Sequence, residues 1–262
     1  METEGSGDCA EWLHEYRKNG HVTIPSVFSP DCMREGLEDV IAWSAEALAH
    51  LSSDKRRRYI DSDVTHMEAL RILDDPQYNR EFFRKLASDP HITSRVDKIL
   101  GKGHEVFSGR IFFKAPGGGG PKPTHQDNFY FNPSRTDGLI TVWIALEDAD
   151  EGNGCLFYGD GSHVEPILRH EAPSSRPHDL AVPADAAARW PLLPSPVTQG
   201  GISIHHGNVF HMSPHNSSDR WRRACSFHYR AADVTFSDSL DADIRLAKAA
   251  AAQAIGESGA FS

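Results

Sequence analysis

The stretch Lys122-Pro-Thr-His125-Gln-Asp127-Asn-Phe-Tyr130 determines how the rest of the chain is interpreted. It resembles the start of a β-strand, in which side chains at positions i and i+2 point to the same face. His125 and Asp127 could therefore bind one metal ion together. A single His-x-Asp is a weak signal, because two common polar residues fall at this spacing by chance in many chains.

A second histidine-rich stretch can complete such a site. It reads Gly200-Gly-Ile-Ser-Ile-His-His-Gly-Asn-Val-Phe-His211-Met-Ser213, and a segment that contains Arg222 follows it. Two histidines and one carboxylate form the facial triad that holds non-haem Fe(II) and leaves coordination positions open. One histidine from this stretch, with His125 and Asp127, would supply that set.

Composition and charge argue against several classes of function. With 262 residues the chain can bury a large core, and we expect a single domain, 1–262. The formal charge of -10 disfavours nucleic acid and anionic membranes as partners. No apolar run approaches the ~20 residues that span a bilayer, and the acidic N-terminus is unlike a signal peptide, so we expect a cytoplasmic protein. The cysteines are scattered, and we expect reduced thiols.

The order of the expected elements favours an α+β, mainly β fold. Helical periodicity covers residues 8–19, 30–48, 81–87 and 92–100, and β-prone runs cover 21–25, 106–114, 138–146, 154–158, 202–209 and 224–230. Ser29 and Pro30 are expected to start the second helix, as cap and first residue. The last two β-prone runs are expected to form a strand pair with His211 between them. Helices followed by antiparallel strands predict a double-sheet barrel flanked by helices. We expect a mainly helical flank (1–103), a barrel core (104–230) and a C-terminal helix and tail (231–262).

Three segments are predicted to lack regular structure. Residues 52–77 lose their periodicity and are expected to form a loop over the site. The glycine-rich residues 115–123 are expected to be a flexible connection. The proline-rich residues 165–197 are expected to form a lid insertion, because long irregular loops are usually functional.

The motifs occur in an order that resembles a known family. They are His125-Gln-Asp127, Trp143-Ile-Ala-Leu-Glu-Asp, Asn153-Gly-Cys-Leu, Gly161-Ser-His163, His211-Met-Ser213 and Arg222. Together they resemble the phytanoyl-CoA dioxygenase family of Fe(II)- and 2-oxoglutarate-dependent oxygenases, over roughly residues 10–230. The resemblance implies a double-stranded β-helix, a cupin-like jelly roll, with iron at one open end.

The resemblance assigns three metal ligands: His125, Asp127 and His211. Other histidines compete with the last ligand: His205, His206 and His215. The spacing from His211 to Ser213 and Arg222 favours His211. Because adjacent strand residues face opposite ways, at most one of the pair at 205 and 206 can approach the site.

The resemblance also implies a 2-oxoglutarate site centred on Arg222, whose planar guanidinium matches a carboxylate. Arg220 and Arg223 are its rivals, but Arg222 shares its strand face with small and polar residues. Further predicted cosubstrate contacts are Ser213, Gln126, Trp143 and Lys114. The predicted substrate contacts are Tyr130, Phe129, His66 and Arg71. No catalytic residue beyond the metal ligands is expected.

The implied reaction is hydroxylation of an unactivated C–H bond in a small metabolite, while 2-oxoglutarate and O2 yield succinate and CO2. Asp127 argues against halogenation, since related halogenases carry a small residue there. One alternative is epimerisation, desaturation or cyclisation of a natural-product intermediate with the same cofactors. A non-catalytic binding or sensor protein is a second, and a zinc hydrolase is a third. Neither the substrate nor the oligomeric state is readable from the sequence.

The sequence departs from the family pattern at three places. Asp160-Gly-Ser-His stands where Pro-Gly-Ser-His is usual, and His211-Met-Ser stands for His-Gly-Ser. His205-His206-Gly207 stands where Phe-His-Gly is usual. None of these departures removes a ligand, but they argue against assigning the chain to a characterised subgroup, and the sequence shows no signature of one with a known substrate.

Overall fold

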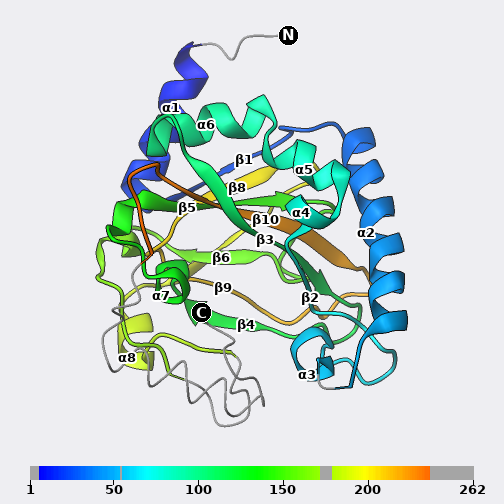
Figure 1. Cartoon of the computed structure of the whole chain (residues 1–262). Coiled ribbons are helices and arrows are strands. Elements are labelled where there is room, and N and C mark those ends of the chain that lie inside the picture. Colours follow the sequence, from blue (N-terminus) through cyan, green and yellow to red (C-terminus); the bar gives the residue numbers. More distant parts are fainter. Residues whose placement is uncertain (1–5, 54, 172–178, 237–262) are drawn as a thin grey trace.

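Two antiparallel sheets form the centre of the computed structural model, which describes residues 6–53, 55–171 and 179–236 (Figure 1). The six-stranded sheet has the order β1 (His21–Ile24), β8 (Ile202–His206), β5 (Leu139–Ala145), β10 (Arg222–Arg230), β3 (Glu105–Lys114) and β2 (Ile72–Asp74). The four-stranded sheet has the order β4 (Lys122–His125), β9 (His211–Ser213), β6 (Leu156–Gly159) and β7 (Leu192–Ser195). The expected jelly-roll core is confirmed.

Four longer helices cover one face of the six-stranded sheet, on the side away from β4, β6 and β9 (Figure 1). They are α1 (Ser6–Asn19), α2 (Pro30–His50), α5 (Glu81–Ala87) and α6 (Pro90–Leu100). The start of α2 is set as the sequence predicts, since the Ser29 hydroxyl accepts the amide hydrogen of Cys32 and Pro30 opens the helix. None of the helices in the described ranges is both long and apolar enough to cross a bilayer.

The remaining helices are short. They are α3 (Arg56–Tyr59), α4 (Pro76–Asn79), α7 (Asp127–Phe131), α8 (Ala184–Ala187) and two 3-10 turns, Thr136–Gly138 and Ser162–Val164. Among them α7 bears on function, because it begins at a predicted metal ligand. The helix expected over 240–255 lies outside the described residues.

Strand alternation gives the six-stranded sheet two different faces. On β5, Val142 and Ile144 pack into the large apolar cluster shared with the helices. The intervening Thr141 and Trp143 point to the other face, toward the four-stranded sheet. Thr141 lies opposite His205 on β8 and His228 on β10, so polar side chains collect on this inner face.

The structure differs from several expectations in detail. β1 matches the β-prone run expected at 21–25, whereas β2 was not expected; both come from the mainly helical flank and pair with β8 and β3. The segment 52–77 contains α3, β2 and α4, and β7 in the expected lid pairs with β6. The last two expected strands do not pair with each other, because β8 and β10 lie on either side of β5. His211 lies on β9, in the other sheet.

The glycine-rich turn 115–123 is held in place along its length rather than forming a loose connection. The Gly120 amide donates to the carboxylate of Asp61 (2.8 Å), and the Gly118 amide donates to the carbonyl of Asn216 (2.8 Å). A Cβ at Gly119 would come within 2.6 Å of the Ala115 backbone nitrogen. The glycines therefore permit close backbone packing beside the start of β4.

Candidate metal and cosubstrate site

The three predicted metal ligands meet at one point. His125 ends β4 and lies directly opposite His211, the first residue of β9. The Nε2 atoms of His125 and His211 each lie 3.7 Å from Oδ1 of Asp127, and the ligand atoms of the three residues lie within 4.8 Å of one another. Asp127 is the first residue of α7 rather than a strand residue, but the extended Gln126 still brings it to the same side as His125.

The tautomers of both histidines suit metal binding. Nδ1 of His125 lies 2.8 Å from the Pro123 carbonyl oxygen, and Nδ1 of His211 lies 3.1 Å from that of Val209. Because a carbonyl oxygen only accepts, each Nδ1 donates its proton and each Nε2 keeps a lone pair for a metal. Burial, together with nearby His211, lowers the pKa of His125 well below its usual range, and burial lowers that of His211 to about 4. Both rings are neutral near pH 7.

The other oxygen of Asp127 is held by two protein donors. Oδ2 accepts from the Thr141 hydroxyl at 2.5 Å and lies 3.1 Å from Nε2 of His205. Burial would raise the pKa of Asp127, but the imidazoles of His211 and His205 outweigh it and hold that pKa well below its usual range. The carboxylate is therefore ionised and offers Oδ1 alone to a metal. Sequence reasoning missed Thr141, which it placed in a buried strand, and considered His205 only as a rival ligand.

Arg222, the first residue of β10, is a buried cation with free donors. It is 3% exposed, and its Nε and Nη1 atoms have no hydrogen-bond partner in the part of the chain that the structure describes. Burial lowers its pKa to about 10, which leaves it cationic near pH 7. A buried guanidinium with unused donors fits an anionic ligand, because an unpaired buried charge is costly.

Arg222 faces the same interior as the metal ligands. Its guanidinium carbon lies 5.8 Å from the centroid of the Trp143 ring. Trp143 follows Thr141 by two residues on one face of β5, a separation of about 7 Å along the strand, and Thr141 contacts Asp127. The cation and the triad thus face the same interior, and the residues present fit both Fe(II) and 2-oxoglutarate.

The comparisons with known proteins agree with this geometry. The family model for phytanoyl-CoA dioxygenase (PhyH) matches residues 16–224. The chain belongs to the phytanoyl-CoA dioxygenase family. The family and the His-Asp-His site together indicate Fe(II), 2-oxoglutarate and O2 as cofactors.

Two curated relatives illustrate how far the family likeness extends. Phytanoyl-CoA dioxygenase domain-containing protein 1 of Mus musculus is 34% identical over 58% of this chain and 54% of its own length. A probable alpha-ketoglutarate-dependent hypophosphite dioxygenase of Stutzerimonas stutzeri is 27% identical over 86% of this chain and 79% of its own length. The chain thus spans about half the length of the mouse relative.

Solved structures of the same fold include two enzymes of nogalamycin biosynthesis. The epimerase SnoN, in complex with Fe3+, alpha ketoglutarate and nogalamycin RO, has a TM-score of 0.71 and 22% identity, over 92% of this chain and 90% of its own. The carbocyclase SnoK has a TM-score of 0.66 and 24% identity, over 91% and 89% of the two chains. At these identities the likeness shows the shared fold alone.

The weaker cosubstrate candidates occupy different positions. Ser213 is buried two residues after His211 on β9, so alternation aims it to the same side as that ligand. The Lys114 ammonium already donates to the carbonyls of Gly120 and Pro214. Burial, with a contribution from Arg222, lowers the pKa of Lys114 well below its usual range. Lys114 therefore ties the glycine-rich turn to the end of β9.

Gln126 is fully buried, and its side chain forms hydrogen bonds with the segment that follows residue 165. Its side-chain nitrogen donates to the carbonyls of Pro166 (2.9 Å) and Asn208 (3.1 Å), and its side-chain oxygen accepts from the Leu168 amide (2.8 Å). The backbone amide of Gln126 donates to Nε2 of His170 (2.9 Å). These bonds occupy both ends of the amide, so Gln126 anchors residues 166–170 beside the site, whereas we expected it to line the cosubstrate pocket.

The predicted substrate residues separate into two groups. Phe129 is fully buried and stacks on His170 at 4.0 Å between ring centroids, and His66 is exposed beside the glycine-rich turn. In contrast, Tyr130 lies edge-on to His125 at 5.8 Å. Arg71 reaches Asp179 at 3.4 Å. Tyr130 thus lies beside a predicted metal ligand and Arg71 beside Asp179, whereas Phe129 packs against His170.

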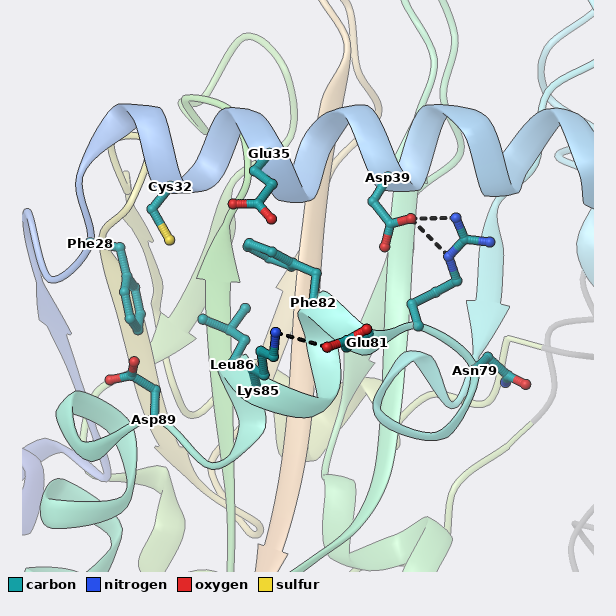
Figure 2. Close-up of a pocket in the computed structure, with 11 residues that line it drawn as sticks. Phe28, Cys32, Glu35, Asp39, Asn79, Glu81, Phe82, Lys85, Leu86 and Asp89 are labelled. Atoms are coloured by element: carbon teal, nitrogen blue, oxygen red, sulfur yellow. Dashed lines mark hydrogen bonds and ion pairs between the residues drawn. The ribbon is translucent and has the colours of Figure 1, made fainter.

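A separate groove lies between α2 and α5, on the helical side of the molecule (Figure 2). Asp39 on α2 and Arg80 form an ion pair across it, and Lys85 pairs with Glu81. Its walls come from helices that carry none of the metal ligands. None of its lining residues is a predicted metal, cosubstrate or substrate contact.

Proposed function

We propose that this protein hydroxylates an unactivated C–H bond of a small metabolite. Fe(II) bound by His125, Asp127 and His211, together with 2-oxoglutarate and O2, supplies the oxidising chemistry, with succinate and CO2 as co-products. The observation that carries the proposal is the pairing of this triad with the buried Arg222, whose Nε and Nη1 donors are unused. A zinc hydrolase has no need of such a cation.

Different residues of the chain would orient the metal ligands, bind 2-oxoglutarate and exclude water. The carbonyls of Pro123 and Val209 orient the two imidazoles, and Thr141 and His205 orient the carboxylate. Arg222 would pair with the distal carboxylate of 2-oxoglutarate, and Ser213 would share it. Trp143 and the apolar residues around it exclude water from that ion pair, which strengthens the attraction.

Polar side chains near Tyr130 support a small polar substrate. Lys122 lies 3.2 Å from the Tyr130 hydroxyl and 3.7 Å from a carboxylate oxygen of Asp179, which Arg71 also approaches. Asp179 is buried, and two cations share its charge. A substrate bound here would contact hydrogen-bond donors close to His125, so we expect a small molecule with oxygen-bearing groups rather than a plain hydrocarbon.

The first experiment adds Fe(II) and 2-oxoglutarate to metal-free protein without oxygen. The wild-type protein should develop the visible metal-to-ligand charge-transfer band, and His211→Ala should lose it. His215→Ala is the matched control, because His215 is an exposed neighbour outside the site and should leave the band intact. If folded wild-type protein gave no band, the proposed cofactor chemistry would be refuted. A zinc hydrolase or a non-catalytic binding protein would then be favoured.

The second experiment identifies the type of reaction. Admitting O2 in the presence of polar metabolites should increase succinate release when a substrate binds, and mass spectrometry should show a product with one added oxygen atom. A product of unchanged mass would mean epimerisation, and loss of two hydrogens would mean desaturation or cyclisation. Either result would contradict hydroxylation while leaving the cofactor assignment in place.

A further inference from the structure

The carboxylate of Asp127 uses its two oxygens for different purposes. Oδ1 faces Nε2 of both ligand histidines at 3.7 Å, whereas Oδ2 faces away and contacts Thr141 and His205. With both contacts on Oδ2, the carboxylate cannot rotate to offer two oxygens to a metal. The position of His205 therefore bears directly on how Asp127 would bind iron.

His205 is itself held by a chain of hydrogen bonds. It lies on β8 opposite Thr141 on β5, and it is 2% exposed. Its Nδ1 atom lies 2.9 Å from the Tyr158 hydroxyl, which lies 2.9 Å from the Ser203 hydroxyl. Residues of β5 and β8 in one sheet and of β6 in the other thus surround the His205 ring.

The direction of these bonds follows from Asp127. An ionised carboxylate only accepts, so Nε2 of His205 donates to Oδ2. The Tyr158 hydroxyl lies within hydrogen-bond distance of both Nδ1 of His205 and the Ser203 hydroxyl, so it links the two side chains. Every polar atom of the chain has a partner, as a buried network requires.

The residue type at 205 matters for this contact, because a phenyl ring would fill the same space without donating a proton. Oδ2 would then keep Thr141 alone, and the Tyr158 hydroxyl would keep Ser203 alone. His205 donates a hydrogen bond to the metal ligand Asp127 but does not bind the metal itself, because its Nε2 is used by the bond to Oδ2.

We propose that His205, oriented by Tyr158, is a positioning residue that holds Asp127 as a one-oxygen metal ligand. Its hydrogen bond draws negative charge toward Oδ2 and fixes Oδ1 where the two imidazoles converge. Partners of this kind beyond the ligands typically change metal affinity by about 10- to 100-fold. The proposal rests on the proposed Fe(II) site, but it concerns metal binding and not turnover.

The test uses Co(II) as a spectroscopic probe of the metal-free, full-length protein. His205→Phe keeps the ring shape and removes the donor, whereas His205→Gln places an amide N–H near the position of Nε2. We expect the Kd for Co(II) to rise about tenfold or more in His205→Phe and to return most of the way to the wild-type value in His205→Gln. The d–d bands should weaken in His205→Phe, because a carboxylate free to bind through two oxygens raises the coordination number.

Two further variants keep the test decisive. Tyr158→Phe removes the hydroxyl that orients the His205 ring, and it should raise the Kd for Co(II) by a smaller factor than His205→Phe. This variant still tests the proposal if His205→Phe fails to fold. His206→Asn is the control, because His206 is also buried but points to the opposite side of β8, and its Co(II) affinity and spectrum should match the wild type.

The outcomes separate this proposal from the proposed function. Wild-type protein that binds no Co(II) would refute the metal site itself. Normal binding by the wild type, with unchanged affinity and spectrum in folded His205→Phe and Tyr158→Phe, would refute the positioning role alone. Equal losses in His205→Phe and His205→Gln would also overturn it, since they would show that the imidazole acts by its shape.

Discussion

At the scale of single residues, the arginine pair at 222 and 223 shows how strand parity assigns chemistry. Arg222 points into the interior with unused donors, whereas Arg223 points outward, bonds to Glu147 at 2.8 Å and lies over the Trp221 ring. The two side chains have the same charge and are adjacent in sequence. Only the first can meet a ligand in the interior.

We predict that Arg222→Lys weakens 2-oxoglutarate binding. A lysine keeps the charge but loses the planar pair of donors, and one hydrogen bond to a charged group is worth roughly 1.5–3 kcal/mol. Titration of the Co(II)-loaded protein with 2-oxoglutarate should show a Kd raised about tenfold or more. Arg223→Lys is the matched control and should leave that Kd unchanged. Equal shifts in both variants would remove Arg222 from the cosubstrate site.

The ligands were predictable at this scale and their supporting residues were not. His125, Asp127 and His211 follow from spacing and motif order, which a sequence displays directly. Thr141 and His205 act through contacts with Asp127 across 14 and 78 residues of chain. No local pattern distinguishes a strand threonine that bonds a ligand from one that only packs, so this part needed the fold.

At the scale of elements, the join between β4 and α7 places the carboxylate, and β8 supports it. Asn128 is the residue after Asp127. Its backbone amide donates to the Gly207 carbonyl (2.8 Å), and its side-chain nitrogen donates to the side-chain oxygen of Asn208 (2.7 Å). A Cβ at Gly207 would lie 2.1 Å from Oδ1 of Asn128. The glycine after β8 thus allows the first turn of α7 to approach.

We predict that Gly207→Ala destabilises the protein by about 1–3 kcal/mol, because the added methyl group must displace a well-packed side chain. Urea unfolding of the metal-free protein measures this change, and Co(II) affinity should fall with it as Asp127 shifts. Gly152→Ala is the control, since its Cβ would meet only a side-chain oxygen of Asp150 at 3.3 Å. Unchanged stability in Gly207→Ala would show that α7 can move without loss.

Element prediction succeeded where periodicity was strong. The runs at β3 and β5 and the capped start of α2 matched the structure closely. Two short strands were missed for physical reasons: β2 has three residues, and β7 contains Pro194, which usually argues against a strand. Pairing partners far apart in the sequence also escaped, which is why β8 and β10 were wrongly paired.

At the scale of the whole molecule, one sheet serves two purposes by alternation. Its outer face is apolar and packs on helices, and its inner face carries charged and imidazole side chains in a closed interior. Burial also keeps three imidazoles of the two sheets neutral near pH 7, since it lowers the pKa of His206, His211 and His228 to about 4. Folding therefore suppresses protonation at several sites at once.

The free energy of unfolding of the metal-free protein should fall as the pH is lowered. In the unfolded chain a histidine binds a proton below its ordinary pKa of about 6.5, whereas buried His206 does so only near pH 4. Between these values the unfolded state holds the extra proton, so acid favours unfolding. Each such histidine lowers the free energy of unfolding by about 1 kcal/mol between pH 7 and pH 5.5.

The variant His206→Asn tests this, because it keeps an acceptor for the Asn208 amide and removes the titration. Urea unfolding at the two pH values should then show a loss smaller by about 1 kcal/mol in the variant than in the wild type. Equal losses would mean that His206 titrates normally in the folded protein.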